Sequence, residues 1–307
     1  MTATRRPRLA VALGDPRGIG PEVVAKALKL SPLEADVVVI GADEQVGAIP
    51  AIARLGVGAW GRGGVGAPDD VRAGMIAADS IKRAAKLAMS GEVDAIVTGP
   101  VNKAALYAAG MRHPGVTELL GELSGGRETV MMLVADALRV VLITTHLPLR
   151  DVPKALTTER VERVGRIAAE GLRRWWGLAS PRLAVCAVNP HAGEGGLFGD
   201  EDDRVLAPAA RLLGAAGPLP ADTVFVRALR GEFDAELAPY HDVGMTAVKV
   251  AGFGRGVNVT LGMPFIRTAP DHGTAFDIAG KDKADPGSMR AALELATSLA
   301  PRRKTHD

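Results

Sequence analysis

The stretch Leu183-Ala-Val-Cys-Ala-Val-Asn-Pro-His191 is a short apolar run that ends in polar residues. Its apolar side chains do not alternate with polar ones, so the run predicts a strand that is buried on both faces. Similar runs, each predicted as a strand, occur at Leu9–Leu13, Val37–Ile40, Ala95–Thr98, Val130–Val134, Arg139–Thr144 and Thr246–Val250. Strands of this kind are typical of a largely parallel sheet covered by helices.

Amphipathic stretches separate these runs. Their apolar residues recur at helical spacing, which predicts helices over Pro21–Leu30, Gly74–Met89, Thr158–Trp176, Asp202–Leu213 and Pro286–Leu299. Strands that alternate with helices indicate the α/β class. The chain has 307 residues, more than one hydrophobic core usually spans, so we expect two subdomains.

Composition excludes several classes of function. The net charge of +2 and the 4% of aromatic residues are unlike a nucleic-acid-binding protein, which needs a basic surface and aromatic side chains for base stacking. No apolar stretch reaches the roughly 18 residues that span a bilayer, so no membrane segment is expected. Cys186 is the lone cysteine, which rules out an internal disulfide or a cysteine-based zinc site, and we expect a cytoplasmic protein.

Two glycine-rich segments are candidates for phosphate-binding loops. Gly61-Arg-Gly-Gly-Val-Gly66 matches G-x-G-x-x-G, but no predicted strand precedes it and no helix start follows. We therefore interpret the match as a coincidence in a glycine-rich chain. Gly14-Asp-Pro-Arg-Gly-Ile-Gly20 precedes a predicted helix and is either an anion site at the helix N-terminus or only a tight turn.

Four of the six histidines follow apolar runs and sit beside Pro, Gly or Asp: His146, His191, His241 and His272. Ligands of α/β proteins bind at the loops that follow the strands, so these side chains are candidates to converge. Three imidazoles with an open fourth position suit a catalytic zinc ion. The competing explanation is that each histidine only forms a hydrogen bond within a turn. The sequence has no local metal-binding pattern such as H-E-x-x-H that would decide between a metal site and this explanation.

The glycine-rich segment Gly252–Asn258 lies between two cations, Lys249 and Arg267. Glycines allow the backbone N–H groups to approach a ligand, and the cations supply charge, so the pattern suits a phosphate or a carboxylate. A glycine-rich turn with solvated cations fits the same composition.

Long motifs lie along nearly the whole chain, at Gly14–Glu22, Thr98–Lys103, Thr145–Asp151, Asn189–Gly196, Gly217–Thr223, Tyr240–Asp242, Gly252–Asn258 and Asp271–Thr274. In this order they resemble the family of NAD-dependent 4-hydroxythreonine-4-phosphate dehydrogenases of pyridoxal phosphate biosynthesis and their paralogues. The resemblance implies two α/β/α subdomains around a central cleft, similar to isocitrate and isopropylmalate dehydrogenases and unlike the Rossmann fold. We expect the first subdomain to comprise residues 1–110 and 280–307, and the second, with the metal ligands and the dimer interface, residues 111–279.

The resemblance also implies a divalent metal ion, zinc or alternatively magnesium or cobalt. His146 and His191 of one subunit and His241 of its neighbour would hold it, so the active site would be shared in a homodimer. A small anionic substrate would meet Thr117, Asp222, Asp242, Lys249, Asn258, Arg267 and the position of Val116. NAD or NADP would lie near Gly252, Gly254, Gly256, Asp271, His272 and Gly273. Asp242 and Lys249 are the candidates for proton transfer.

Two residues depart from the family pattern. Val116 stands where the family has a histidine that binds substrate, and Val243 stands where it has a glutamine. An apolar side chain cannot replace a hydrogen-bond donor, so the identity of the substrate stays open. We expect the reaction class to be the same as in the family. His113 is a candidate to replace the missing donor.

We therefore expect metal-dependent, NAD-linked oxidation of 4-phosphohydroxy-L-threonine or a close analogue, followed by decarboxylation of the keto acid. The alternative substrates are a phosphorylated sugar acid of the phosphothreonate or phosphoerythronate type, and a cyclic cis-diol carboxylate of the terephthalate dihydrodiol type. A protein that binds a metal and a phosphorylated ligand without turnover is the alternative from another class.

Overall fold

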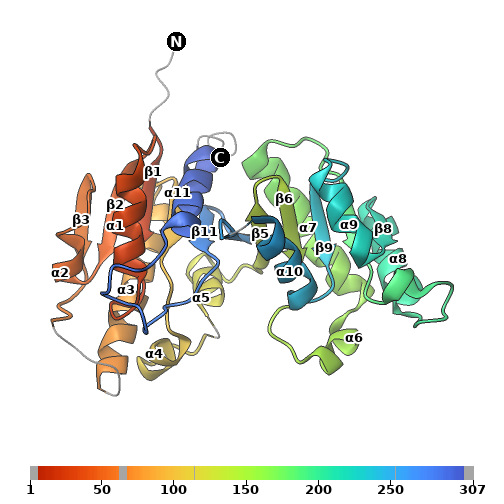
Figure 1. Cartoon of the computed structure of the whole chain (residues 1–307), viewed down its shortest axis with the longest axis horizontal. Coiled ribbons are helices and arrows are strands. Elements are labelled where there is room, and N and C mark those ends of the chain that lie inside the picture. The colour runs from red at the N-terminus through yellow and green to blue at the C-terminus, as the bar shows by residue number, and fades with distance from the viewer. Residues whose placement is uncertain (1–5, 62–67, 114, 253, 301–307) are drawn as a thin grey trace, which may run out of the picture. The chain divides into compact units, whose positions relative to one another are not determined.

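The computed structural model describes residues 6–61, 68–113, 115–252 and 254–300. The chain forms two compact units (Figure 1). Unit 1 takes in Met1–Thr129 and Met263–Asp307, and unit 2 takes in Val130–Gly262. Residues 111–129 and 263–279, which we had expected in the second subdomain, thus belong to unit 1 because they pair and pack with its strands and helices.

Unit 1 is built on a parallel sheet with the strand order β3-β2-β1-β4-β11. The strands are β1 (Arg8–Ala12), β2 (Asp36–Gly41), β3 (Ala53–Gly56), β4 (Ala95–Thr98) and β11 (Ile266–Pro270). The predicted strands at Leu9–Leu13, Val37–Ile40 and Ala95–Thr98 are confirmed to within a residue at each end. Every residue of β4 is buried, as expected for a strand that is covered on both faces.

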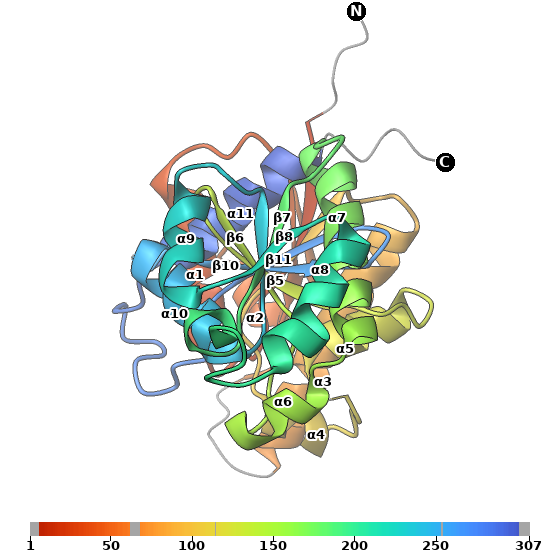
Figure 2. The same cartoon turned by 90° about the vertical axis from the view of Figure 1, so that its right-hand side faces the viewer.

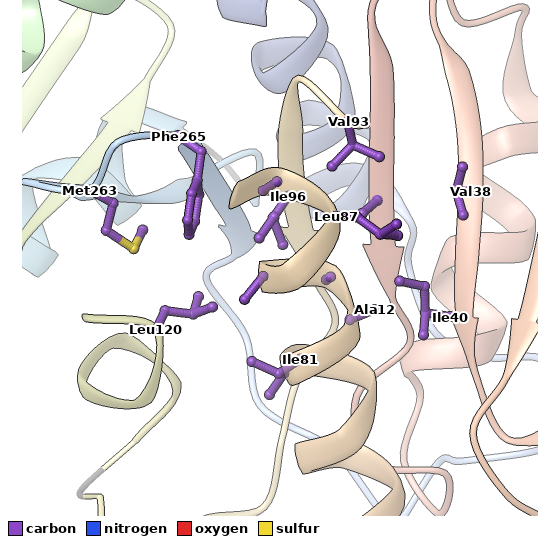
Figure 3. Close-up of a cluster of buried hydrophobic side chains, with 14 of the residues drawn as sticks. Ala12, Val38, Ile40, Ile81, Leu87, Val93, Ile96, Leu120, Met263 and Phe265 are labelled. Carbon is purple, nitrogen blue, oxygen red and sulfur yellow. The ribbon is translucent and has the colours of Figure 1, made fainter. Parts of the chain in front are cut away.

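Helix α3 (Asp69–Met89) covers one face of this sheet. Figure 3 shows Ile81 and Leu87 of α3 against Ile40 of β2 and Ile96 of β4, in a cluster that Phe265 also joins. Each fully buried side chain of this size contributes about 1.5–3 kcal/mol to folding. Helices α1 (Gly20–Leu30) and α11 (Gly287–Leu299) pack against each other, and α11 also packs on β11, β4 and β1 (Figure 1).

Three short helices complete unit 1: α2 (Asp43–Val46), α4 (Lys103–Ala108) and α5 (Val116–Leu123). Asn102 caps α4, because its side chain accepts a hydrogen bond from the N–H of Ala105 at 2.9 Å. Residues 62–66 of the Gly61–Gly66 segment lie outside the described residues. The strand β3 does precede that segment and α3 does follow it, so our expectation of no such elements there is wrong.

Unit 2 is built on a mixed sheet with the strand order β10-β5-β6-β9-β7-β8. The strands are β5 (Val130–Ala135), β6 (Leu138–Leu142), β7 (Leu183–Cys186), β8 (Ala216–Leu219), β9 (Ala235–Ala238) and β10 (Val257–Leu261). β5 runs antiparallel to β10 and β6, whereas β6, β9, β7 and β8 are parallel. The hairpin between β5 and β6 turns at Asp136, whose φ is 50°, a conformation that Asp tolerates in turns.

Helices cover both faces of the sheet in unit 2. The helices α9 (Ala221–Leu229) and α10 (His241–Gly252) lie on one side of the strands, and α7 (Thr158–Trp176) and α8 (Ala207–Leu213) lie on the other (Figure 2). The shorter elements are η1 (Leu149–Asp151), α6 (Val152–Ala155), η2 (Pro190–Gly193) and η3 (Asp202–Leu206). None of the helices in the described ranges is long and apolar enough to cross a bilayer.

The predicted strand Thr246–Val250 is wrong, because these residues lie inside helix α10. Its β-branched residues favour a strand locally, yet Gly244, Val248 and Gly252 are buried at a spacing of four residues. A Cβ atom on Gly244 would lie 2.6 Å from a methyl carbon of Leu142, so this helix face packs closely against β6. Tertiary packing thus overrides local propensity here.

Other predicted elements also differ from the structure, because local sequence does not show how the segments pack. The predicted helix Asp202–Leu213 divides into the π-helical turn η3 and helix α8. Five strands that we did not predict, β3, β8, β9, β10 and β11, contain polar residues, glycine or proline, or alternate between buried and exposed positions.

Glu236 lies in the middle of β9 with no exposed surface. Its register partners are Val140 and Ala184, and neither of its carboxylate oxygens has a hydrogen-bond partner among the described residues. Burial raises the pKa of this carboxyl group to about 8, and the positive charge of Arg139 opposes the rise only in part. Glu236 is therefore held in the fold as a neutral acid.

Glu236→Gln is expected to remove a pH dependence of stability. As the pH rises from about 4.5 to about 8, the unfolded chain ionises Glu236 while the folded chain keeps it protonated, so the free energy of unfolding falls. The wild type should lose about 1.4 kcal/mol per pH unit relative to Glu236→Gln in this range. Urea unfolding at a series of pH values measures the difference, and parallel curves for the two proteins would contradict the assignment.

Candidate functional site

The three predicted metal ligands follow parallel strands of unit 2. His146 comes after β6, His191 after β7, and His241 directly after β9 at the start of α10. Because β6, β9 and β7 run parallel, their carboxyl ends meet at one edge of the sheet. The fold therefore brings all three loops to the same edge.

His146 and His241 lie side by side at this edge. Their ring centroids are 5.6 Å apart and the rings are inclined at 42°. The Oδ1 atom of Asp242 lies 2.6 Å from Nδ1 of His241. A carboxylate accepts a proton donor, so this contact favours the proton on Nδ1 and leaves the Nε2 lone pair available to a ligand.

His191 stands apart from this pair. It lies in η2 with φ 53° and ψ 27°, its side chain is exposed, and its ring centroid is 6.2 Å from that of Phe198. No group of three side chains that could hold a metal forms within the described residues. β9 lies between β6 and β7 in the sheet, so within one chain His146 neighbours His241 rather than His191. Which histidines of a metal site come from the same subunit, as the resemblance implied for His146 and His191, stays a prediction.

A cavity of about 320 Å³ opens beside His191. Its lining consists of Ala187, Val188, Asn189, Pro190, His191, Ala221, Asp222, Tyr240 and Val243. The structure thus brings together three positions singled out from the sequence, His191, Asp222 and Val243. Tyr240 is a lining residue that sequence reasoning gave no role, although its place next to His241 in the Tyr240–Asp242 motif was the available signal.

Lys249 and Asn258 lie elsewhere in unit 2. Lys249 is in the last turn of α10, seven residues after Asp242, so the two share a face of the helix. Asn258 lies on β10, where its Oδ1 atom is buried and has no hydrogen-bond partner among the described residues. An unsatisfied buried acceptor is costly in a folded protein and is typical of a position that meets a ligand.

In the predicted cofactor segment Gly252–Asn258, one glycine serves packing and another leaves space for a ligand. Gly252 ends α10, where a Cβ atom would lie 2.9 Å from the Cβ atom of Ala135, so this glycine serves packing. Gly254 has φ 81° with open space around it, whereas Gly256 is buried. Phe253 lies outside the described residues.

Arg267 is buried on β11 in unit 1. Its Nη2 and Nε atoms donate to Oγ1 of Thr98 at 2.7 and 3.2 Å. Burial lowers the pKa of Arg267 to about 10, and the negative charge of Glu118 opposes the shift. A buried guanidinium is a strong anion-binding group, because its field is poorly screened by water.

Val116 and Thr117 form the first turn of α5 and are both half-buried. The Val116 side chain packs against a core cluster that contains Ala77, Ala78 and Leu106. An apolar residue is therefore well accommodated at this departure from the family pattern. Nε2 of His113, the candidate replacement donor, lies 2.5 Å from Oε2 of Glu122, which engages one of its two ring nitrogens.

Asp271, His272 and Gly273 follow β11 in unit 1. Oδ1 of Asp271 accepts a hydrogen bond from Oγ of Ser288 at 3.0 Å, and Nδ1 of His272 lies 3.1 Å from the carbonyl oxygen of Gly273. Nε2 of His272 is buried without a hydrogen-bond partner in the described part of the chain, and the space around Gly273 is open. These features leave polar groups available to a ligand.

The Gly14–Gly20 segment forms a tight turn. Arg17 donates to both carboxylate oxygens of Asp15 and also pairs with Asp70, and these carboxylates raise the pKa of its guanidinium. A Cβ atom on Gly20 would lie 2.0 Å from the carbonyl oxygen of Leu13, so only glycine fits there. Of the two explanations for this segment, the tight turn agrees with the structure, because its cation is already paired.

Comparison with known proteins gives a family match over most of the chain. The model of the family described as Pyridoxal phosphate biosynthetic protein PdxA matches residues 18–296. The chain is 43% identical to a 4-hydroxythreonine-4-phosphate dehydrogenase of Beijerinckia indica, over 95% of this chain and 94% of the relative. It is also 43% identical to a D-threonate 4-phosphate dehydrogenase of Salmonella typhimurium, over 95% and 98%.

Solved structures agree with this result. A 4-hydroxythreonine-4-phosphate dehydrogenase from Klebsiella pneumoniae is 39% identical, with a TM-score of 0.85 over 97% of this chain and 99% of that one. A terephthalate 1,2-cis-dihydrodiol dehydrogenase from Burkholderia xenovorans is 30% identical, with a TM-score of 0.66 over 96% and 98%. A β-decarboxylating dehydrogenase from Thermococcus kodakarensis shares the fold alone, at 16% identity and a TM-score of 0.51 over 95% and 83%.

Asp15→Ala is expected to destabilise unit 1 by about 3 kcal/mol, because it removes one of the two carboxylates that neutralise the buried Arg17. Asp15→Ala combined with Arg17→Met should recover much of this loss, since no buried charge then lacks its partner. Urea unfolding of Asp15→Ala, Arg17→Met, the double variant and the wild type measures the coupling. A loss below about 0.5 kcal/mol for Asp15→Ala would show that the pair carries little of the turn's stability.

Proposed function

Since the chain belongs to the family of the pyridoxal phosphate biosynthetic protein PdxA, we propose that it oxidises a phosphorylated hydroxy acid with NAD. It is an oxidoreductase that acts on a CH–OH group, as its dehydrogenase relatives are. The observation that carries the proposal is the His146 and His241 pair, with Asp242 behind His241, at the carboxyl edge of the sheet in unit 2.

We propose that His146 and His241 of one chain and the partner's His191 hold a divalent metal ion, zinc in the first place. The donor set fits, because imidazole nitrogens are ligands that zinc prefers, and a catalytic zinc site takes a third protein ligand beside these two. The family resemblance is the basis for a metal at this position, and the distance of 5.6 Å between the His146 and His241 ring centroids supports placing these two ligands in one chain.

Exposed apolar side chains beside these histidines support a homodimer. Leu147 and Leu149 follow His146 and are 43% and 65% exposed, and Leu197 and Phe198 follow His191 and are 74% and 45% exposed. Apolar side chains of this size, gathered beside polar functional groups, are typical of a surface that a partner covers. We propose that the partner is a second copy of the chain.

The proposed reaction assigns roles to the residues of this chain. A divalent ion held by these histidines would supply Lewis acidity toward the substrate hydroxyl and the keto group, and NAD would supply the hydride acceptor. Asp242 orients His241 through Nδ1. Asp242 and Nζ of Lys249, which lie on the same face of α10, are the groups that transfer the proton of the hydroxyl group.

The substrate is anionic in this proposal. Arg267 binds its phosphate or carboxylate, because a buried guanidinium interacts strongly with an anion that reaches it. Thr117, Asp222 and Asn258 supply the remaining polar contacts. The orphan Nε2 of His272 and the open backbone at Gly273 and Gly254 support a position for the dinucleotide near those residues.

4-Phosphohydroxy-L-threonine is the proposed substrate, with loss of CO₂ from the keto acid. D-Threonate 4-phosphate is the second candidate, because a relative of that name is as similar to this chain as one named for the first compound. Val116 packs against the core, so the fold accommodates an apolar residue where the family has a histidine that binds substrate. We therefore retain both phosphorylated compounds as candidate substrates.

The test is the initial rate of NADH formation by the metal-replete protein, with NADP⁺ in place of NAD⁺ as a second arm. The substrates are 4-phosphohydroxy-L-threonine, D-threonate 4-phosphate and a cyclic cis-diol carboxylate. We expect kcat/KM for one phosphorylated compound to exceed that for the diol by at least about 100-fold, because Arg267 would bind a dianion. Turnover of the diol alone would refute the phosphorylated substrate, and no turnover of any compound would favour a binding protein.

Mixed dimers test the shared metal site. A dimer of one His191→Ala chain and one His146→Ala chain keeps one complete site, with His146 and His241 from the first chain and His191 from the second. We therefore expect up to half of the wild-type activity and about one bound metal ion per mixed dimer. A dimer of His146→Ala and His241→Ala chains should have neither, because each site loses a ligand.

Separately tagged chains, exchanged and purified as mixed dimers, allow activity and metal content to be measured on defined species. Activity in the dimer of His146→Ala and His241→Ala chains, with none in the dimer of His191→Ala and His146→Ala chains, would show that His241 acts across the interface. This result would overturn the arrangement proposed from the geometry.

A further inference from the structure

The loop that carries His191 has an unusual backbone. His191, Ala192 and Glu194 have φ values of 53°, 56° and 43°, in the left-handed region. Residues with a Cβ atom are disfavoured there, and three of them in one short loop require support from the surrounding structure. The loop is exposed, so packing of its own side chains supplies little of that support.

The support comes from a buried carboxylate on the next element. Asp202, the first residue of η3, has no exposed surface. Its Oδ1 accepts a hydrogen bond from the N–H of Val188 at 2.9 Å, and its Oδ2 accepts one from the N–H of Asn189 at 3.0 Å. These two amides lie between the end of β7 and His191, so the carboxylate fixes the direction in which the chain leaves the strand.

A neighbouring acid holds the side chain of the same segment. Oε2 of Glu201 accepts a hydrogen bond from Nδ2 of Asn189 at 2.8 Å. A Cβ atom on Gly199 would lie 2.7 Å from that Nδ2 and 2.8 Å from that Oε2, so the absent side chain makes room for the contact. Backbone and side chain of Asn189 are thus both anchored to the start of η3.

The charge of Asp202 makes these bonds strong. No ion pair involves Asp202 within the parts of the chain that the structure describes, so the two backbone N–H groups are its partners. Hydrogen bonds to a buried ionised acceptor are roughly twice as strong as neutral ones. Their free energy offsets the strain of the left-handed residues that follow.

We propose that Asp202 is a positioning residue: its buried carboxylate clamps the Val188–Asn189 backbone and so holds the left-handed loop that presents His191. The clamp does not depend on what His191 binds. Its consequence for metal affinity rests on the proposed function, in which His191 is the ligand given to the partner subunit.

Asp202→Asn is the test, with Asp203→Asn as the matched control. Asparagine has nearly the same shape, but its NH₂ group faces one of the two amide N–H groups and cannot accept from it, so one bond is lost. Asp203 is the next residue along the chain and is exposed, so the same change there leaves the clamp intact.

The first readout is amide hydrogen exchange in the full-length apo protein. We expect the amides of Val188 and Asn189 to exchange at least tenfold faster in Asp202→Asn and at the wild-type rate in Asp203→Asn. Wild-type exchange at both amides in Asp202→Asn would overturn the clamp, whether or not the protein binds a metal.

The second readout is affinity for Zn²⁺ or Co²⁺, measured by titration with the visible spectrum of Co²⁺ as reporter. Removal of a group that orients a metal ligand typically lowers the metal affinity by about 10–100-fold. We expect a loss of that size in Asp202→Asn and none in Asp203→Asn. A lower melting temperature with unchanged metal affinity would mean a purely structural role and would overturn the positioning of His191. A wild type that binds no metal would refute the proposed metal site but leave the exchange result to decide the clamp.

A second variant guards against a protein that fails to fold. Ala192→Gly removes the steric penalty of the left-handed conformation without touching Asp202. Introduced into Asp202→Asn, it should restore part of the metal affinity, by threefold or more, because the loop then needs less support. No recovery in a folded double variant would contradict the link between the carboxylate and the backbone conformation.

Discussion

Parallel strands that neighbour each other deliver the loops after them to one edge of the sheet, and the pairing of β6 with β9 is the constraint on which the site in unit 2 depends. This pairing sets His146 beside His241, because one follows β6 and the other follows β9. β7 pairs with the far side of β9, so His191 comes to the same edge without entering the pair. In the proposed dimer a second chain supplies the third imidazole.

Four buried charged groups show how the fold treats charge away from water. Asp15 is neutralised by Arg17, and Asp202 is bound by two backbone amides. These carboxylates are satisfied and serve to hold loops in place. Glu236 has no hydrogen-bond partner among the described residues and is held neutral by its environment. Arg267 is bonded to a neutral hydroxyl group and keeps a positive charge in the core, which suits an anionic ligand.

The departure at Val116 has a packing explanation. Its side chain joins the apolar cluster beneath α3 and α5, where a histidine ring would have to point elsewhere or lose its hydrogen bonds. We expect the reaction class not to depend on this position, because the histidines, Lys249, Asn258 and Arg267 that we propose for the reaction are all present. Substrate choice is therefore the property on which this chain and its dehydrogenase relatives are most free to differ.

The sequence alone predicted the α/β class, the strands β1, β2, β4, β5, β6 and β7, and the family with its candidate residues. Unbroken apolar runs identify strands that are covered on both faces, and motifs identify a family by residue type and order, both of which are local properties. The tertiary structure decided that Thr246–Val250 is helical, that His241 rather than His191 neighbours His146 within the chain, and that Asp202 accepts hydrogen bonds from the backbone before His191. Each of these depends on which segments pack together, and the order of strands in a sheet cannot be read from the spacing of residues along the chain.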